Sequence, residues 1–274
     1  MSAPGALLRA AHPQPTAAVT TLATAVAASA GRSAAGCMLV AATVLTGQLS
    51  IGWSNDVVDA RRDAVAGRRD KPIAAGEISP RTVAGACAVA LALCLPLSFA
   101  NGWRAGLVHL GLVAGGWAYN LGLKRTLLSF VPYAVSFGIL PAFLSLGLDG
   151  HPLPRPWVVL ASALLGVGAH FLNVVPDVRD DLDAGVRGLP QRLGERGART
   201  GGALLLAAAS AVVTFGPGGD VPTWAYAGFG LAAALSLGAA VAPARLGSRG
   251  PFLLSLLTAA VTVALLVGRG GAIT

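Results

Sequence analysis

Two short segments hold most of the acidic residues of this chain, and the first has a spacing suited to binding a metal ion. Asn55, Asp59 and Asp63 are four residues apart, so they share one face if the preceding helix continues through them. Asp56 adds a further carboxylate beside Asn55. Like charges on one helical face repel. A hard cation such as Mg²⁺ would offset that repulsion while keeping positions for water and phosphate oxygens. The segment therefore predicts a Mg²⁺ site.

The second segment repeats this design. Asn173, Asp177 and Asp181 are again four residues apart, with Asp180 beside them. When residues 55–82 are placed on residues 173–200 without a gap, 13 of the 28 positions are identical. Internal repeats in membrane proteins place functional sites where the two halves meet. We therefore expect both segments to contribute to one site.

Cations accompany the acids. Lys71 follows the first segment, and Lys124 and Arg125 lie between the two segments. A departing diphosphate needs its developing negative charge neutralised, and Mg²⁺ together with Lys or Arg does this. The mixture of acids and bases favours a diphosphate ligand over a free cation.

The elements that position these residues are predicted by the distribution of charge. The chain is 54% hydrophobic and only 12% charged, and nine stretches of 19 to 24 residues contain no Asp, Glu, Lys or Arg. A helix needs about 20 mostly apolar residues to cross a bilayer. We therefore predict an all-α polytopic membrane protein of about nine transmembrane helices, forming a single domain over residues 1–274. The predicted spans are 10–31, 33–55, 82–103, 105–123, 126–148, 156–176, 200–219, 221–244 and 250–268.

The cations also predict an orientation, because cytoplasmic loops are enriched in Lys and Arg. With nine spans, all but four of the 20 Lys and Arg residues fall on one side, and Arg245 and Arg249 are among those counted there. We expect the N-terminus and the acidic loops, at about 55–81 and 177–199, to be cytoplasmic, in a bacterial-type plasma membrane. The repeat offset of four helices returns the chain to the same side, which indicates two parallel pseudo-repeats. The net charge of +8 then follows from topology rather than from nucleic-acid binding.

At these residues the sequence resembles the UbiA superfamily of intramembrane prenyltransferases. Asn55, Asp56, Asp59 and Asp63 match the family signature N-D-x2-D-x3-D in full, and Lys71 stands where the family has Arg. Tyr119 precedes Lys124 and Arg125 in a way similar to the family, with one extra residue in the interval. The second family signature is matched by Asp177, Asp181, Gly185, Leu189, Pro190, Leu193 and Gly194.

The resemblance implies a helical bundle around a lipid-accessible central cavity, in which two Mg²⁺ ions hold the diphosphate of an allylic isoprenoid. The carbon–oxygen bond ionises and the carbocation alkylates a small-molecule or lipid acceptor, often an aromatic ring. The metal-binding set implied is Asn55, Asp56, Asp59, Asp63, Asp177 and Asp181, with the alternative for Asp56 that it orients a neighbouring residue. The catalytic set is Asp59, Asp63, Asp177, Asp181 and Lys124. The substrate-binding set is Lys71, Tyr119, Lys124, Arg125, Asn173 and His170, the last because an ionisable residue at membrane depth is a functional candidate.

Two other interpretations stay open. A membrane terpene cyclase of the same superfamily would let the cation attack its own chain, and it would need the same acidic segments. A transporter or lipid carrier would place its acids at the bilayer midplane. The acids here follow the ends of the predicted spans, which disfavours transport.

Overall fold

The computed structural model describes residues 3–241, 250–269 and 273–274, and these residues form helices joined by short loops. Nine long helices in this part of the chain each overlap one predicted span, so the all-α prediction is confirmed. Seven are long and apolar enough to cross a membrane; the other two are α2 and α5. The long helices are α2 (Pro13–Ser29), α3 (Ala34–Val65), α4 (Pro80–Ala100), α5 (Trp103–Leu121), α6 (Val131–Leu146), α7 (Pro156–Val174), α9 (Leu189–Phe215), α10 (Thr223–Val241) and α11 (Gly250–Gly268). The short ones are α1 (Ala3–Ala10), α8 (Val178–Asp183), η1 (Leu123–Arg125), η2 (Leu127–Phe130) and η3 (Val175–Asp177).

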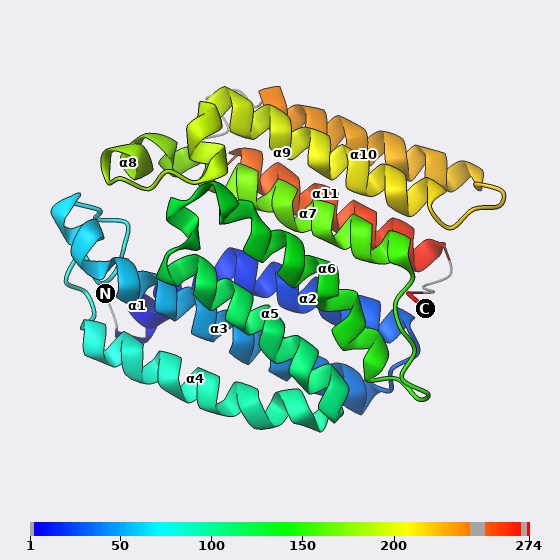
Figure 1. Ribbon diagram of the computed structural model, residues 1–274, viewed down its shortest axis with the longest axis horizontal. Coiled ribbons are helices and arrows are strands. Elements are labelled where there is room, and N and C mark those ends of the chain that lie inside the picture. Colours follow the sequence, from blue (N-terminus) through cyan, green and yellow to red (C-terminus); the bar gives the residue numbers. More distant parts are fainter. Residues whose placement is uncertain (1–2, 242–249, 270–272) are drawn as a thin grey trace.

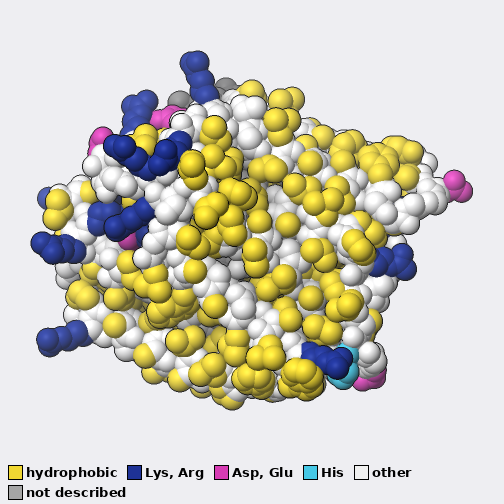
Figure 2. All heavy atoms as spheres, viewed as in Figure 1, with side chains coloured by type: hydrophobic (Ala, Val, Ile, Leu, Met, Phe, Trp, Pro, Cys, Tyr) yellow, Lys and Arg dark blue, Asp and Glu magenta, His cyan; other side chains and the backbone are white. Residues whose placement is uncertain are grey.

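The bundle brings the two acidic segments to one end. In Figure 1 the loop that follows α3 and the short helix α8 lie at the same end of the molecule, although the four long helices α4 to α7 lie between them in the sequence. The predicted placement of both segments on one side of the bundle agrees with this arrangement. Figure 2 shows Lys and Arg side chains gathered at that end and a broad hydrophobic surface over the helices. Arg245 and Arg249 lie outside the described residues.

The two halves close their acidic segments with the same local structure. Gly67 and Gly185, which correspond in the repeat, both have a left-handed backbone, with φ of 67° and 75°. In each half the following amide donates back to the carbonyl of the last acid: Arg68 N to Asp63 O at 3.0 Å, and Val186 N to Asp181 O at 2.7 Å. This is a common glycine-dependent helix end. The repeat therefore extends to backbone conformation.

Small residues allow close packing of α7 and α9. A Cβ placed on Gly202 would lie 2.7 Å from Cγ of Leu172 and 3.1 Å from the carbonyl oxygen of Gly168. The Gly168 carbonyl is backbone and has little freedom to move. Small residues at helix interfaces are the usual means by which membrane helices approach closely.

We predict that Gly202→Val lowers the midpoint of thermal unfolding in detergent, because overfilling a packed interface costs about 1–3 kcal/mol. Gly230→Val is the matched control, since a Cβ at that helical position would meet nothing within 4 Å. Dye-monitored thermal unfolding of both variants measures the difference. Equal midpoints would contradict the packing argument.

Candidate active site

The first acidic segment lies within a single helix, as the sequence predicted. α3 continues to Val65 without a Gly or Pro after Gly52, and Ala60 and Ala64 favour helix at these positions. Asp59 and Asp63 are only 2% and 3% exposed. Buried carboxylates require partners, and the site supplies them.

The second acidic segment differs from the first. Pro176 has no backbone N–H, so the α-helix stops at Val174, continues as the 3₁₀ helix η3 and resumes as α8. The expected continuous helical ladder is therefore not formed in this half. Asp177 and Asp181 nevertheless both line the same cavity as Asp59. Gln191 Nε2 donates to Asp181 Oδ2 at 2.9 Å.

One cavity of about 370 Å³ connects a polar end to a long apolar end. From Asp59 to Val44, which both line it, α3 rises about 22 Å at 1.5 Å per residue. The polar end is lined by Asn55, Asp59, Asn173, Asp177 and Asp181 together with Arg62, Arg68, Lys71 and Lys124. The apolar lining includes Val26, Val44, Leu144, Val158 and Leu266. A ligand with a charged head and an apolar tail matches this division.

Lys124 is the central cation of the polar end. Its Nζ donates to both carboxylate oxygens of Asp59, at 2.7 and 2.6 Å, and to Asn55 Oδ1 at 3.2 Å. Arg62 bridges Asp59 and Asp63, with Nη2 at 3.0 and 3.1 Å from their oxygens. Burial lowers the pKa of Lys124, against the opposing effect of Asp59. Asp63 does not line the cavity, and its carboxylate contacts Arg62.

Arg68 joins the two acidic loops. Its Nη2 lies 3.0 Å from Asp177 Oδ1, and its Nε and Nη2 each donate to Asp70 at 2.9 Å. These hydrogen bonds hold the pKa of Asp70 below its usual range. Arg68 lines the cavity, but it is not among the site residues predicted from the sequence. The feature of the sequence that could have indicated Arg68 is its position directly after Gly67, where the helix that carries Asp63 ends.

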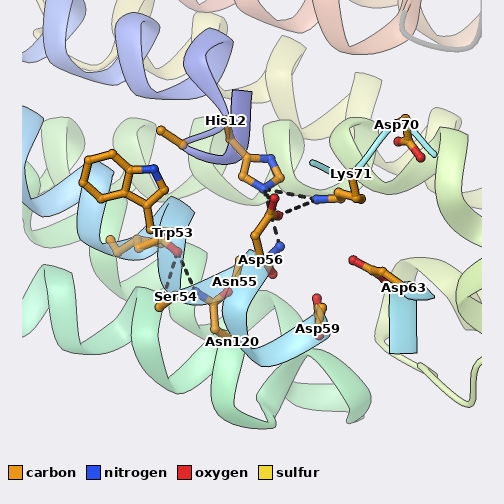
Figure 3. Close-up of polar contacts among 12 residues, drawn as sticks. His12, Trp53, Ser54, Asn55, Asp56, Asp59, Asp63, Asp70, Lys71 and Asn120 are labelled. Atoms are coloured by element: carbon orange, nitrogen blue, oxygen red, sulfur yellow. Dashed lines mark hydrogen bonds and ion pairs between the residues drawn. The ribbon is translucent and has the colours of Figure 1, made fainter. Parts of the chain in front are cut away.

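A second group of contacts surrounds Asp56 (Figure 3). Asp56 Oδ1 accepts from Lys71 Nζ at 2.8 Å and lies 2.9 Å from His12 Nε2. His12 lies between α1 and α2 and lines the cavity with Lys71, whereas Asp56 does not line it. His12 was not among the predicted site residues either, because nothing in the residues around it indicates that this segment folds back over α3.

Two predicted substrate-binding residues do not reach the cavity. Arg125 is exposed and is not part of the lining. His170 is fully buried, stacks on Tyr133 with ring centroids 4.2 Å apart, and is not part of the lining either. Tyr119 does line the cavity and meets Tyr133 edge-on at 5.1 Å. Aromatic rings therefore form part of the cavity lining.

The donor set fits Mg²⁺ that is shared with a phosphate ligand. Within the described residues, no three His, Cys, Asp or Glu side chains are grouped so that they could hold a metal by themselves. Oxygen donors from both segments nevertheless face one cavity. Mg²⁺ usually binds through one or two carboxylates and takes its other ligands from water and substrate phosphates.

The chain is similar to known proteins over most of its length. The model of the UbiA prenyltransferase family matches residues 17–248. A UbiA homologue from Aeropyrum pernix, solved without ligand, superposes with a TM-score of 0.71 at 19% identity, covering 98% of this chain and 99% of the other. A UbiA homologue from Archaeoglobus fulgidus, solved bound to GPP and Mg²⁺, gives 0.68 at 19% identity over 95% and 99%.

A structure described as digeranylgeranylglyceryl phosphate synthase gives a TM-score of 0.65 at 18% identity, covering 100% of this chain and 99% of the other. No curated protein matches the sequence. At these identities the structural matches establish the fold.

Proposed function

Because the chain belongs to the UbiA prenyltransferase family, we propose that this integral membrane enzyme transfers an isoprenyl group from an allylic polyprenyl diphosphate to an acceptor. The observation that carries the proposal is the cavity that joins paired acids and bases at one end to an apolar passage at the other. We further propose an aromatic acceptor, in keeping with the family resemblance of the sequence.

The side chains suggest how the reaction is assisted. Lys124, Lys71 and Arg68 line the polar end and are positioned to bind diphosphate oxygens. Bound Mg²⁺, held by Asn55, Asp59, Asp177 and Asp181, would neutralise charge on the departing diphosphate. The apolar passage holds the isoprenoid chain and excludes water from it.

Aromatic rings support the cationic stage. Tyr119, Tyr133 and Phe137 line the cavity, and ring faces attract cations. In the transfer, the bond from C1 to the diphosphate oxygen breaks with its electron pair on oxygen. C1 then bonds to the acceptor, which loses a proton.

A turnover assay tests the proposal. Purified protein in detergent is given radiolabelled geranyl, farnesyl or longer diphosphates with a panel of phenolic and lipid acceptors, in Mg²⁺ or in EDTA. We expect Mg²⁺-dependent diphosphate release and a prenylated acceptor. A hydrocarbon formed without acceptor would identify a cyclase instead. Absence of isoprenoid diphosphate binding in Mg²⁺ would refute the proposal.

We also propose that the acidic end faces the cytoplasm, supported by the cations gathered there (Figure 2). A membrane-impermeant maleimide applied to intact bacterial cells tests this. We predict labelling of Asp149→Cys, which is exposed in the loop after α6, and none of Asp183→Cys, which is exposed at the end of α8. Both variants should react after permeabilisation. The reverse pattern would show the opposite orientation.

A further inference from the structure

His12 occupies a backbone conformation that must be enforced by its surroundings. Its φ of 51° and ψ of 65° are left-handed, a region that residues other than Gly adopt rarely and that often marks functional sites. Ala11 before it is 1% exposed, and its carbonyl accepts from Thr16 Oγ1 at 2.9 Å. Pro13 after it begins α2. The turn is therefore specified on both sides.

The N-terminal helix pair is docked closely on α3. Trp53 Nε1 donates to the carbonyl of Leu7 at 2.9 Å. Gly52 approaches Ala11 so closely that a Cβ there would lie 2.6 Å from the Ala11 carbonyl oxygen. These contacts involve the two residues of α3 that precede Ser54 and Asn55. They fix the turn directly above the first acidic segment.

A third contact ties the same helix pair to the loop that carries Lys71. Arg9 forms an ion pair with Glu77. The turn is thus held both by α3 and by the loop after it.

This packing places His12 beside the carboxylate of Asp56, which Lys71 also contacts. Lys71 Nζ lies 2.8 Å from Asp56 Oδ1 and 3.2 Å from His12 Nε2, so the three groups form one cluster (Figure 3). Asp56 is 2% exposed and lies behind the lining, whereas the other two side chains line the cavity. His12 Nδ1 has no hydrogen-bond partner among the described residues. Asn55 Nδ2, 3.5 Å from Nε2, completes the surroundings.

We propose that His12 is a further residue of the diphosphate site, and that Asp56 is not a metal ligand but a positioning residue that holds His12 and Lys71 toward the diphosphate. The inference rests on the proposed function and deepens it. It gives two neighbouring carboxylates different roles. Asp59 faces the cavity and would bind the metal, whereas Asp56 positions the two bases, His12 and Lys71.

Binding measurements separate these roles. The full chain in detergent is titrated with radiolabelled geranyl diphosphate at saturating Mg²⁺, and with Mg²⁺ at a fixed diphosphate concentration. For Asp56→Asn we expect a Kd for geranyl diphosphate at least tenfold higher, as for loss of a charge-assisted hydrogen bond, with the Mg²⁺ half-saturation concentration unchanged within about twofold. For Asp59→Asn we expect the Mg²⁺ half-saturation concentration to rise at least tenfold.

His12→Asn tests the histidine without disturbing the turn, because Asn tolerates a left-handed backbone. We expect it to follow Asp56→Asn, with a weaker Kd and an unchanged Mg²⁺ requirement. Asp183→Asn, an exposed acid at the end of α8, is the control and should match the wild type. Unfolding midpoints near that of the wild type confirm that each variant is folded.

Two results would overturn the inference. One is a rise in the Mg²⁺ requirement of Asp56→Asn equal to that of Asp59→Asn, and the other is an unchanged Kd in both Asp56→Asn and His12→Asn. Failure of the wild type to bind geranyl diphosphate in Mg²⁺ would instead refute the proposed function, and the inference with it.

Discussion

Replacing Asp59 by alanine is expected to lower Mg²⁺-dependent diphosphate release by about 10²- to 10³-fold, the usual range for loss of one group that stabilises transition-state charge. Asp59 is the first-segment carboxylate that both lines the cavity and contacts two cations, Lys124 and Arg62. Its loss would remove a proposed oxygen ligand of the metal and the carboxylate that Lys124 and Arg62 both contact. Steady-state turnover with geranyl diphosphate and an acceptor that the wild-type enzyme prenylates measures the effect.

The structural cost of this change needs its own control. Removing one partner of a buried ion pair is strongly destabilising, by about 3–5 kcal/mol, because the other charge stays buried. Asp59→Asn keeps the volume and a hydrogen-bond acceptor, and it should also be inactive while unfolding closer to the wild-type midpoint. Asp180→Ala, an exposed acid of the second segment, should keep near-normal turnover. Because an amide oxygen can also bind Mg²⁺, only activity retained in both Asp59→Asn and Asp59→Ala would exclude Asp59 as a required metal ligand.

Lys124→Met is expected to reduce kcat/KM for the isoprenoid diphosphate by about 10²-fold or more, through loss of a charge-assisted contact to the leaving group. The Mg²⁺ half-saturation concentration should respond differently from that of the Asp59 variants, in which it is expected to rise. Without the ammonium at 2.6 Å, the Asp59 carboxylate attracts Mg²⁺ more strongly, so the Mg²⁺ half-saturation concentration should stay level or fall. Turnover measured across Mg²⁺ concentrations gives both quantities.

The neighbouring cation is the matched comparison for Lys124. Arg125 has the same sign of charge but is exposed and outside the cavity lining. Arg125→Met should therefore change kcat/KM by no more than about twofold, within the range typical of exposed charges. A loss equal to that of Lys124→Met would show that Arg125 reaches the diphosphate, as the sequence alone suggested.

Much of the fold follows from the sequence because a bilayer excludes charge. Each charge-free stretch became a long helix, and the acids that follow them came to one end of the bundle. The four-residue spacing of Asn55, Asp59 and Asp63 was sufficient in the first half, because nothing in α3 interrupts the helix. In the second half Pro176 interrupts it, and spacing alone gave the wrong local structure.

The residues that the sequence missed depend on contacts between distant segments. Asp56 contacts His12, 44 residues before it in the chain, and Arg68 meets Asp177 in the other half. Neither contact has a periodic signal. His170 shows the opposite case, because a histidine at membrane depth was predicted to bind substrate but does not line the cavity and packs instead against Tyr119 and Tyr133, which do.

The pairing of Lys124 with Asp59 has a consequence for the release of product. A ligand that binds both groups must first separate a pair joined at 2.6 and 2.7 Å, so part of its interaction energy is spent on that separation. The same pair re-forms when the ligand departs and favours its departure. In the proposed reaction, an internal counter-ion of this kind would weaken the binding of inorganic pyrophosphate after the isoprenyl group has left, and so would limit inhibition by the product.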